Sequence, residues 1–137
     1  RPHISLYGND YHTSDGTCVR DYIHVSDLAD AHVLALASLE KSGPSGAYNL
    51  GNGAGYTIRE VISSVERVTG AHVPVVEAPP RAGDPAALVG DASRAIKDLG
   101  WRPQFPGLDE IIGTAWAWRQ KSRSRSGNAT SPLGGAR

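Results

Sequence analysis

Residues 22–40 read YIHVSDLADAHVLALASLE, and this stretch decides the fold class. The run from Tyr22 to Val25 is rich in β-branched and aromatic residues and predicts a strand. Ser26 or Asp27 can cap the helix predicted next, over about residues 28–40. That helix is apolar on most of its faces, so we expect it to be largely buried. A strand followed directly by a buried helix is typical of α/β proteins.

Strands and helices alternate on both sides of this unit. The segments Ile4–Tyr7 and 47–50 predict strands. Thr57 and Glu60 form a capping box ahead of apolar positions at helical spacing, which is the clearest helix start in the chain. The remaining predicted elements are an edge strand at 73–76 and helices at 92–99 and 108–120. So few strands predict an α/β arrangement whose Rossmann-like sheet is completed by strands from outside this chain.

Composition excludes several function classes. The 137 residues carry 14 Lys and Arg against 14 Asp and Glu, so net charge does not favour nucleic acid as a partner. The sequence contains no apolar run of about 18 residues, so we expect no membrane span. The single cysteine, Cys18, precludes an internal disulfide and fits a reducing, cytoplasmic location.

The two ends of the sequence are also informative. The chain starts at Arg1 without Met or a secretion signal and enters a strand almost at once, so we interpret it as a fragment. From Ser122 onward, Ser-Arg repeats with Gly, Asn and Pro predict disorder. We therefore expect an ordered region over residues 1–121 and a disordered tail over residues 122–137.

A glycine-rich stretch, Gly51-Asn52-Gly53-Ala54-Gly55, lies between a predicted strand and a capped helix. A dinucleotide-binding loop would occupy that place, but its third glycine follows the second by three residues, and here it follows by two. The pattern favours a structural turn over a phosphate cradle.

Two arginines in predicted loops, Arg20 and Arg81, have the chemistry to bind a diphosphate. Guanidinium groups offer several fixed donors and keep their charge. Nearby, Asp84 can accept hydrogen bonds from sugar hydroxyls, and Tyr7 can stack on a base. The alternative is that Arg20 pairs with a neighbouring aspartate and Arg81 with Asp84 as ordinary surface ion pairs. Spacing alone does not separate the two interpretations.

These residues belong to motifs that resemble the carboxy-terminal region of UDP-glucose 4-epimerases, a branch of the extended short-chain dehydrogenases/reductases. The resemblance runs from Ile4 to about Trp118. The Arg-Asp-Tyr-Ile-His-Val block occurs throughout that wider family, whereas its combination with the preceding Asp-Gly-Thr-Cys and the later Arg-Ala-Gly-Asp-Pro points to the epimerase branch. The motifs that carry it are residues 7–11, 15–25, 27–29, 48–53, 81–85 and 99–101.

The resemblance implies a role for each matching residue in binding UDP-sugar. The segment matching Ser5, Leu6 and Tyr7 contacts the uracil, through backbone hydrogen bonds and the aromatic ring. The arginines matching Arg20 and Arg81 bind the diphosphate, and the aspartate matching Asp84 binds ribose hydroxyls. The tyrosine matching Tyr22 lies close to them.

The resemblance also implies an activity for the whole enzyme. Tightly bound NAD takes hydride from C4 of the sugar and returns it to the other face, which interconverts UDP-glucose and UDP-galactose. In the family, a tyrosine with a lysine four residues later acts as base, and no tyrosine of this chain has that lysine. We therefore expect this chain to bind UDP-sugar, with NAD bound by a missing amino-terminal part. The full-length enzyme is expected to be a homodimer.

Two other functions stay open at this point. The first is a related epimerase, decarboxylase or dehydratase of nucleotide sugars. The second is a non-catalytic, nucleotide-binding remnant.

Overall fold

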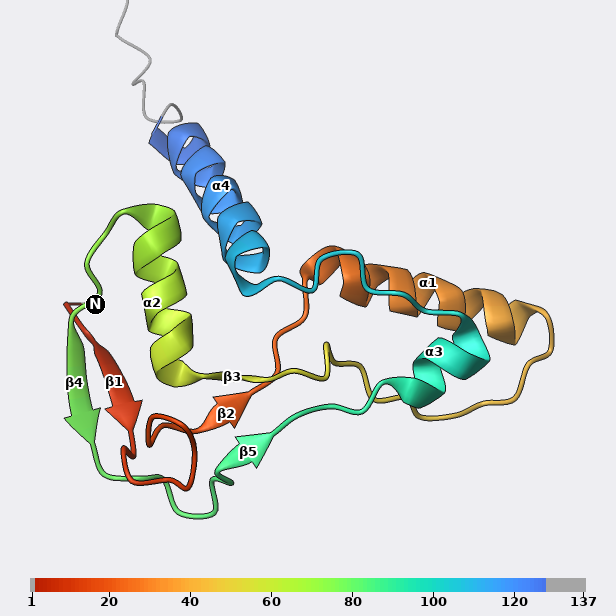
Figure 1. Cartoon of the computed structure of the whole chain (residues 1–137). Helices are drawn as coiled ribbons and strands as arrows, with labels where there is room; N and C mark the ends of the chain where they lie inside the picture. The colour runs from red at the N-terminus through yellow and green to blue at the C-terminus, as the bar shows by residue number, and fades with distance from the viewer. Residues whose placement is uncertain (1, 128–137) are drawn as a thin grey trace, which may run out of the picture.

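The computed structural model describes the backbone of residues 2–127 and the side chains of residues 2–124. Two groups of elements lie at opposite ends of the molecule (Figure 1). One contains β1 (Ile4–Tyr7), α2 (Ile58–Thr69) and β4 (Val75–Ala78), and the other contains α1 (Val25–Glu40) and α3 (Ser93–Leu99). Extended segments carrying β2 (Val19–Arg20), β3 (Tyr56–Thr57) and β5 (Ala87–Leu88) join the two groups, and α4 (Leu108–Gly127) follows.

The strands form two small sheets. Strand β1 pairs with β4 in parallel, with Ile4 opposite Val75 and Tyr7 opposite Ala78. In the second sheet β2 is central, antiparallel to β3 and parallel to β5. The α/β class predicted from the sequence is confirmed. Pro74 precedes β4 and its carbonyl accepts a hydrogen bond from the Ile4 amide at 2.9 Å, so the missing donor of proline is not needed there.

Helix α2 begins as the sequence predicts. The Thr57 side chain accepts a hydrogen bond from the Glu60 amide at 3.1 Å, and the Glu60 carboxylate accepts one from the Thr57 amide at 2.7 Å. The helix ends at Gly70, whose φ of 68° lies in the left-handed region that glycine adopts without strain. The capping box is therefore confirmed.

The predicted strand at residues 22–25 is wrong. Val25 is already helical, and the N-cap of α1 is His24 instead of Ser26 or Asp27. The Nδ1 atom of His24 accepts a hydrogen bond from the Ser26 amide at 3.1 Å, which satisfies one of the free donors at the helix start. The predicted strand at 47–50 is also absent from the described chain, since that segment crosses the α1–α3 core without pairing.

The core is small and lies between α1 and α3. Trp101 and Ala95 are completely buried there with Ala31 and Ala92, and half-buried apolar residues around 23, 34, 48 and 50 pack against them. The prediction that α1 would be largely buried is wrong for the described chain, because Val33 and Leu36 are 64% and 58% exposed. Only Asp27 and Ala31 of that helix are buried.

Helix α4 continues to Gly127, past the predicted end at residue 120. The first part of the predicted disordered tail is thus helical in the structure, and the rest lies outside the described residues. Throughout the described part of the chain, none of the helices combines the length and apolar character needed to cross a membrane.

Candidate functional site

Arg20 lies in the central strand of the second sheet. Val19 and Arg20 pair with Thr57 and Tyr56 on one side and with Ala87 and Leu88 on the other. The Arg20 guanidinium donates to its neighbour's carbonyl, that of Val19, at 2.6 Å, and its other terminal nitrogen forms an ion pair with Asp84. The side chains of Arg20 and Asp84 keep 20% and 27% exposure, so the pair lies at the surface without being open to solvent on all sides.

Arg81 belongs to the same loop as Asp84. The Asp84 amide donates to the Arg81 carbonyl at 3.2 Å, and Gly83 between them has a φ of 78°. This turn requires a residue that tolerates the left-handed region, which glycine does. The Arg81 guanidinium carbon lies 3.9 Å from the centre of the Tyr7 ring, in a cation–π contact.

A cleft of about 640 Å³ opens beside this contact. Ser5, Tyr7 and Arg81 belong to its lining, together with residues around His3 and His72. Leu6 points the other way, into the protein, and is 2% exposed, as alternation along a strand requires. Leu6 can therefore contact a ligand in the cleft only through its backbone.

The structure thus brings six of the seven predicted site residues to two neighbouring places. Ser5, Leu6 and Tyr7 lie on β1 beside the cleft with Arg81, and Arg20 lies against Asp84. Arg20, Asp84 and the seventh, Tyr22, do not line the cleft. Burial raises the pKa of the half-buried Tyr22 hydroxyl, with a further contribution from Cys18.

The surface ion pairs weighed from the sequence are not the ones observed. Arg20 pairs with Asp84 instead of with Asp15 or Asp21. Arg81 contacts the Tyr7 ring instead of pairing with Asp84. Asp15 accepts from the side chains of Thr17 and Thr57, at 2.7 and 2.6 Å. Although burial acts in the opposite direction, hydrogen bonds from Thr57 and Thr17 hold the pKa of Asp15 below its usual value.

Sequence reasoning missed the role of Asp21. Its carboxylate accepts hydrogen bonds from three backbone amides, those of Asn52, Gly53 and Gly90, at 3.0, 3.2 and 3.1 Å. Asn52 in turn donates its side-chain amide to the Tyr22 carbonyl at 2.6 Å. Asp21 therefore ties the end of β2 to two glycine-containing loops. About 30 residues separate Asp21 from the glycine-rich turn, so the sequence offered no signal for this contact.

The same contacts decide the role of the glycine stretch at 51–55. The amides of Asn52 and Gly53 are already used by Asp21, and a Cβ on Gly51 would lie 2.3 Å from an Asp21 oxygen. These amides do not fit a dinucleotide diphosphate, because an acidic side chain occupies the place of the anion. The predicted structural turn is confirmed, and the described residues offer no dinucleotide cradle of this kind.

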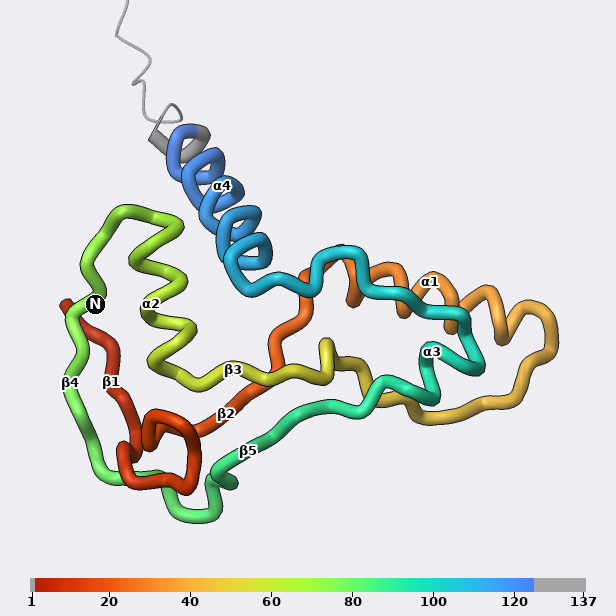
Figure 2. The backbone as a smooth tube through the Cα atoms, in the orientation of Figure 1, coloured from red at the N-terminus to blue at the C-terminus, as the bar shows by residue number. Residues whose placement is uncertain are grey.

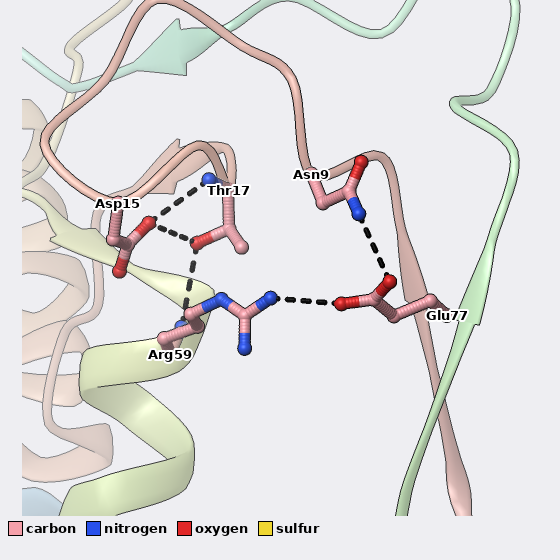
Figure 3. Close-up of polar contacts among 5 residues, drawn as sticks. All are labelled: Asn9, Asp15, Thr17, Arg59 and Glu77. Carbon is pink, nitrogen blue, oxygen red and sulfur yellow. Dashed lines mark hydrogen bonds and ion pairs between the residues drawn. The ribbon is translucent and has the colours of Figure 1, made fainter.

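The loop after β1 is fixed by a polar network (Figure 3). Glu77 of β4 accepts from the Asn9 side chain and from Arg59, both at 2.9 Å, and Thr17 accepts from the Arg59 amide at 3.4 Å. Asp15 accepts from Thr17. The network joins the two sheets and the start of α2, so it positions Tyr7 relative to Arg20.

Cys18 and His24 do not form a nucleophile pair. The two nitrogens of the buried His24 ring are engaged by the Ser26 amide and by the Thr114 hydroxyl, the latter at 2.8 Å. Cys18 is buried. Within the part of the chain that the structure describes, no group of histidine, cysteine and acidic side chains is arranged to bind a metal ion.

The chain is similar to UDP-glucose 4-epimerases of known sequence and structure. Residues 3–51 match the model of the NAD dependent epimerase/dehydratase family. The chain is 47% identical over 121 residues to the UDP-glucose 4-epimerase of Halalkalibacterium halodurans, covering 88% of this chain and 36% of that protein. It is 48% identical over 136 residues to the UDP-glucose 4-epimerase of Azospirillum brasilense, covering 99% and 39%.

Solved structures give the same result. A crystal structure of a UDP-glucose 4-epimerase matches with a TM-score of 0.85 and 48% identity, over 90% of this chain and 37% of that one. The Bifidobacterium longum enzyme in complex with NAD+ and UDP matches with a TM-score of 0.78 and 41% identity, over 90% and 36%. The chain therefore spans little more than a third of the length of the relatives it matches.

Proposed function

Since this chain is homologous to a carboxy-terminal portion of UDP-glucose 4-epimerases, we propose that it is the UDP-sugar-binding part of an enzyme that interconverts UDP-glucose and UDP-galactose. The enzyme works through a 4-keto sugar with bound NAD, in galactose metabolism. The observation that carries this proposal is the 48% identity to a solved UDP-glucose 4-epimerase along 90% of the chain.

The uracil binds on strand β1, in the cleft lined by Ser5, Tyr7 and Arg81. Backbone groups of Ser5 and Leu6 form hydrogen bonds with the polar edge of the base, and the Tyr7 ring stacks on its face. Leu6 suits this role because its side chain is buried and fixes the strand. The support for this placement is that Ser5 and Tyr7 line the cleft while the Leu6 side chain between them is buried.

The diphosphate is bound by Arg20 and Arg81, and the ribose by Asp84. In the structure each of these groups already has a partner, Asp84 for Arg20 and Tyr7 for Arg81. Pairing of this kind keeps the guanidinium groups in place without a ligand. A diphosphate offers several charged oxygens, so it competes well for both arginines. Tyr22 follows Arg20 by two residues.

Firm binding of the nucleotide has a purpose in this reaction. The sugar must present both of its faces in turn while UDP stays fixed, so binding energy is concentrated on the nucleotide and the phosphates. NAD supplies the hydride exchange at C4 when it is bound. The glycine-rich turn at residues 51–55 does not fit NAD, because Asp21 occupies the amides of Asn52 and Gly53. We therefore place the cofactor and the catalytic base in a part of the enzyme outside this chain.

Isothermal titration calorimetry of this chain with UDP tests the proposal. Wild type is expected to bind, and Arg20→Ala or Arg81→Ala to weaken binding at least tenfold, by analogy with other charged hydrogen bonds. Circular dichroism of each variant verifies folding. A folded wild-type chain that does not bind UDP contradicts the proposal. A coupled NADH assay of the same chain should give no turnover above background.

A second candidate is an enzyme acting on another UDP-sugar. A neighbour with 29% identity and a TM-score of 0.69, MoeE5, was solved in complex with UDP-glucuronic acid and NAD. The sugar of UDP-glucuronic acid carries a carboxylate, and this carboxylate needs a hydrogen-bond donor in the binding site. Titration with UDP-glucose and UDP-glucuronic acid separates the two, since a preference for the acid by this chain supports the second.

The location and assembly of the enzyme are also part of the proposal. We place it in the cytoplasm, because the only cysteine of this chain is a free, buried thiol. We propose that the whole enzyme is a homodimer. Size-exclusion chromatography with light scattering tests this, and a monomeric whole enzyme contradicts it.

A further inference from the structure

Tyr11 has a polar atom that the structure leaves without a partner. Its hydroxyl oxygen is buried and makes no hydrogen bond to any described residue. Buried polar side-chain atoms in folded proteins nearly always have a partner, so each exception needs an explanation. The Tyr11 backbone, in contrast, is well bound, since its amide donates to the Gly16 carbonyl and its carbonyl accepts from the Thr13 amide, at 2.9 and 2.8 Å.

The Tyr11 ring lies against the loop that carries Asp84. A Cβ on Gly8 would be 2.5 Å from the ring of Tyr11 and 3.2 Å from Pro80, so the ring and Pro80 meet at this glycine. The loop after β1 and the loop after β4 run together here, because the Gly8 amide donates to the Ala78 carbonyl at 2.9 Å (Figure 2). Tyr11 is thereby held at the base of the loop that ends in Asp84.

The charges that act on the Tyr11 hydroxyl include those of Asp84 and Arg20, two residues of the proposed ligand site. Burial raises the pKa of this phenol, and the negative charge of Asp84 raises it further, while Arg20 acts in the opposite direction. The hydroxyl therefore keeps its proton at neutral pH and is available as a donor.

Asp84 is satisfied by Arg20 only while no diphosphate is bound. When the phosphates take the Arg20 guanidinium, the Asp84 carboxylate loses its ion-pair partner in a site that is only 27% exposed. A carboxylate that stays charged in such a place needs a hydrogen-bond donor. The ribose hydroxyls occupy only part of this carboxylate, and the Tyr11 hydroxyl, on which the charge of Asp84 acts, is available to donate to the rest of it.

We propose that Tyr11 is a positioning residue whose hydroxyl donates a hydrogen bond to the Asp84 carboxylate once a nucleoside diphosphate has drawn Arg20 away. The inference rests on the proposed function, since it needs the diphosphate at Arg20. Tyr11 then holds Asp84 in the orientation in which it binds the ribose. In the unliganded chain the hydroxyl contributes no hydrogen bond, and in the liganded chain it contributes one to a charged group.

The test compares Tyr11→Phe with wild type in two measurements. We expect UDP affinity, from calorimetry, to fall about tenfold, as for the loss of one hydrogen bond to a charged group. The thermal midpoint of the unliganded chain should stay the same, because no hydrogen bond is lost there. Tyr48→Phe is the control: its ring packs near Arg94 in the α1–α3 part of the chain, and its UDP affinity should match wild type.

A double substitution tests whether Tyr11 acts through Asp84. In the Asp84→Ala background, Tyr11→Phe should have no further effect on UDP affinity. The inference is overturned by unchanged UDP affinity in Tyr11→Phe, by a lower unliganded midpoint, or by the same tenfold loss in the Asp84→Ala background. These outcomes differ from failure of the proposed function, in which wild type itself does not bind UDP or Arg20→Ala binds as well as wild type.

Discussion

Arg20 and Asp84 form an ion pair although 64 residues separate them in the sequence. The pair exists because β5 runs parallel to β2, with Arg20 opposite Leu88, so the loop before β5 passes beside the guanidinium. The same loop carries Arg81 to the Tyr7 ring. One loop therefore connects the cleft beside β1 to the charged pair on β2.

Replacing Arg20 should abolish most of the affinity for UDP. Arg20→Ala removes a charged donor of the diphosphate, and we expect a loss of at least tenfold in calorimetry. Arg20→Lys should recover part of it, since a lysine keeps the charge without the paired donors. Arg94→Ala is the matched control, because Arg94 pairs with Asp98 on the exposed surface of α3. Equal losses for the Arg20 and Arg94 variants would contradict the assignment.

Gly51 should tolerate no side chain. A Cβ there would lie 2.3 Å from the Asp21 carboxylate and 2.8 Å from the Gly90 carbonyl, so Gly51→Ala must displace the hydrogen bonds that hold β2. We expect a loss of about 1–3 kcal/mol in the free energy of unfolding, in the range for overpacked sites. Gly107→Ala is the control, since its nearest neighbour would be 4.0 Å away. Urea denaturation measures both, and equal stability of the two variants would refute the argument.

Asp109 should make the contact between α2 and α4 sensitive to acid. Hydrogen bonds from Arg67, and then from Ser64, lower the pKa of Asp109 from 3.8 to about 2. A lowered carboxyl pKa stabilises the fold above the unfolded value, and this stabilisation is lost as the pH falls through the folded value. The thermal midpoint should therefore fall between about pH 4 and pH 2, and fall less steeply in Asp109→Asn.

The control for this pH effect is Asp30→Asn, on the exposed surface of α1. It should keep the pH dependence of wild type. If Asp109→Asn shows the same slope of midpoint against pH as wild type, the hydrogen bonds of Asp109 do not contribute to acid sensitivity.

Trp101 should be the residue on which the core depends. Its side chain is completely buried and donates to the Asp27 carbonyl at 2.8 Å. Trp101→Ala is expected to cost about 3–5 kcal/mol, enough to abolish cooperative unfolding in a chain with so small a core. In a urea titration, the stability of Trp101→Phe should lie between that of wild type and that of Trp101→Ala. Trp118→Ala removes a side chain that is 67% exposed, and it should change stability by about 0.5 kcal/mol or less.

Predictions made from short sequence patterns are confirmed where the structure depends on contacts between residues close together in the sequence. The Thr57 and Glu60 capping box involves groups three residues apart, and it forms as predicted. The spacing of the glycines at residues 51–55 is enough to distinguish this turn from a dinucleotide-binding loop. Predictions failed where a longer-range contact decides. The β-favouring run at 22–25 forms no strand, because His24 caps α1, which begins at Val25, and its ring also contacts the Thr114 hydroxyl.

Burial was misjudged for a related reason. The apolar residues of α1 predict a covered helix, yet Val33 and Leu36 stay exposed, because burial requires a second surface and the described part of the chain does not present one to that side of the helix. The periodicity of a sequence states which residues favour burial. It does not state that the covering element belongs to the same chain.

The sequence by itself determined the α/β class, the α2 start and the residue types able to bind a nucleoside diphosphate, because these depend on neighbours along the chain or on side-chain chemistry. Only the tertiary structure decided that Arg20 pairs with Asp84, that Asp21 occupies the glycine-rich amides, and that Tyr11 keeps a buried, unpartnered hydroxyl. Each of these depends on which distant strands and loops pack together, and residue order alone does not specify that.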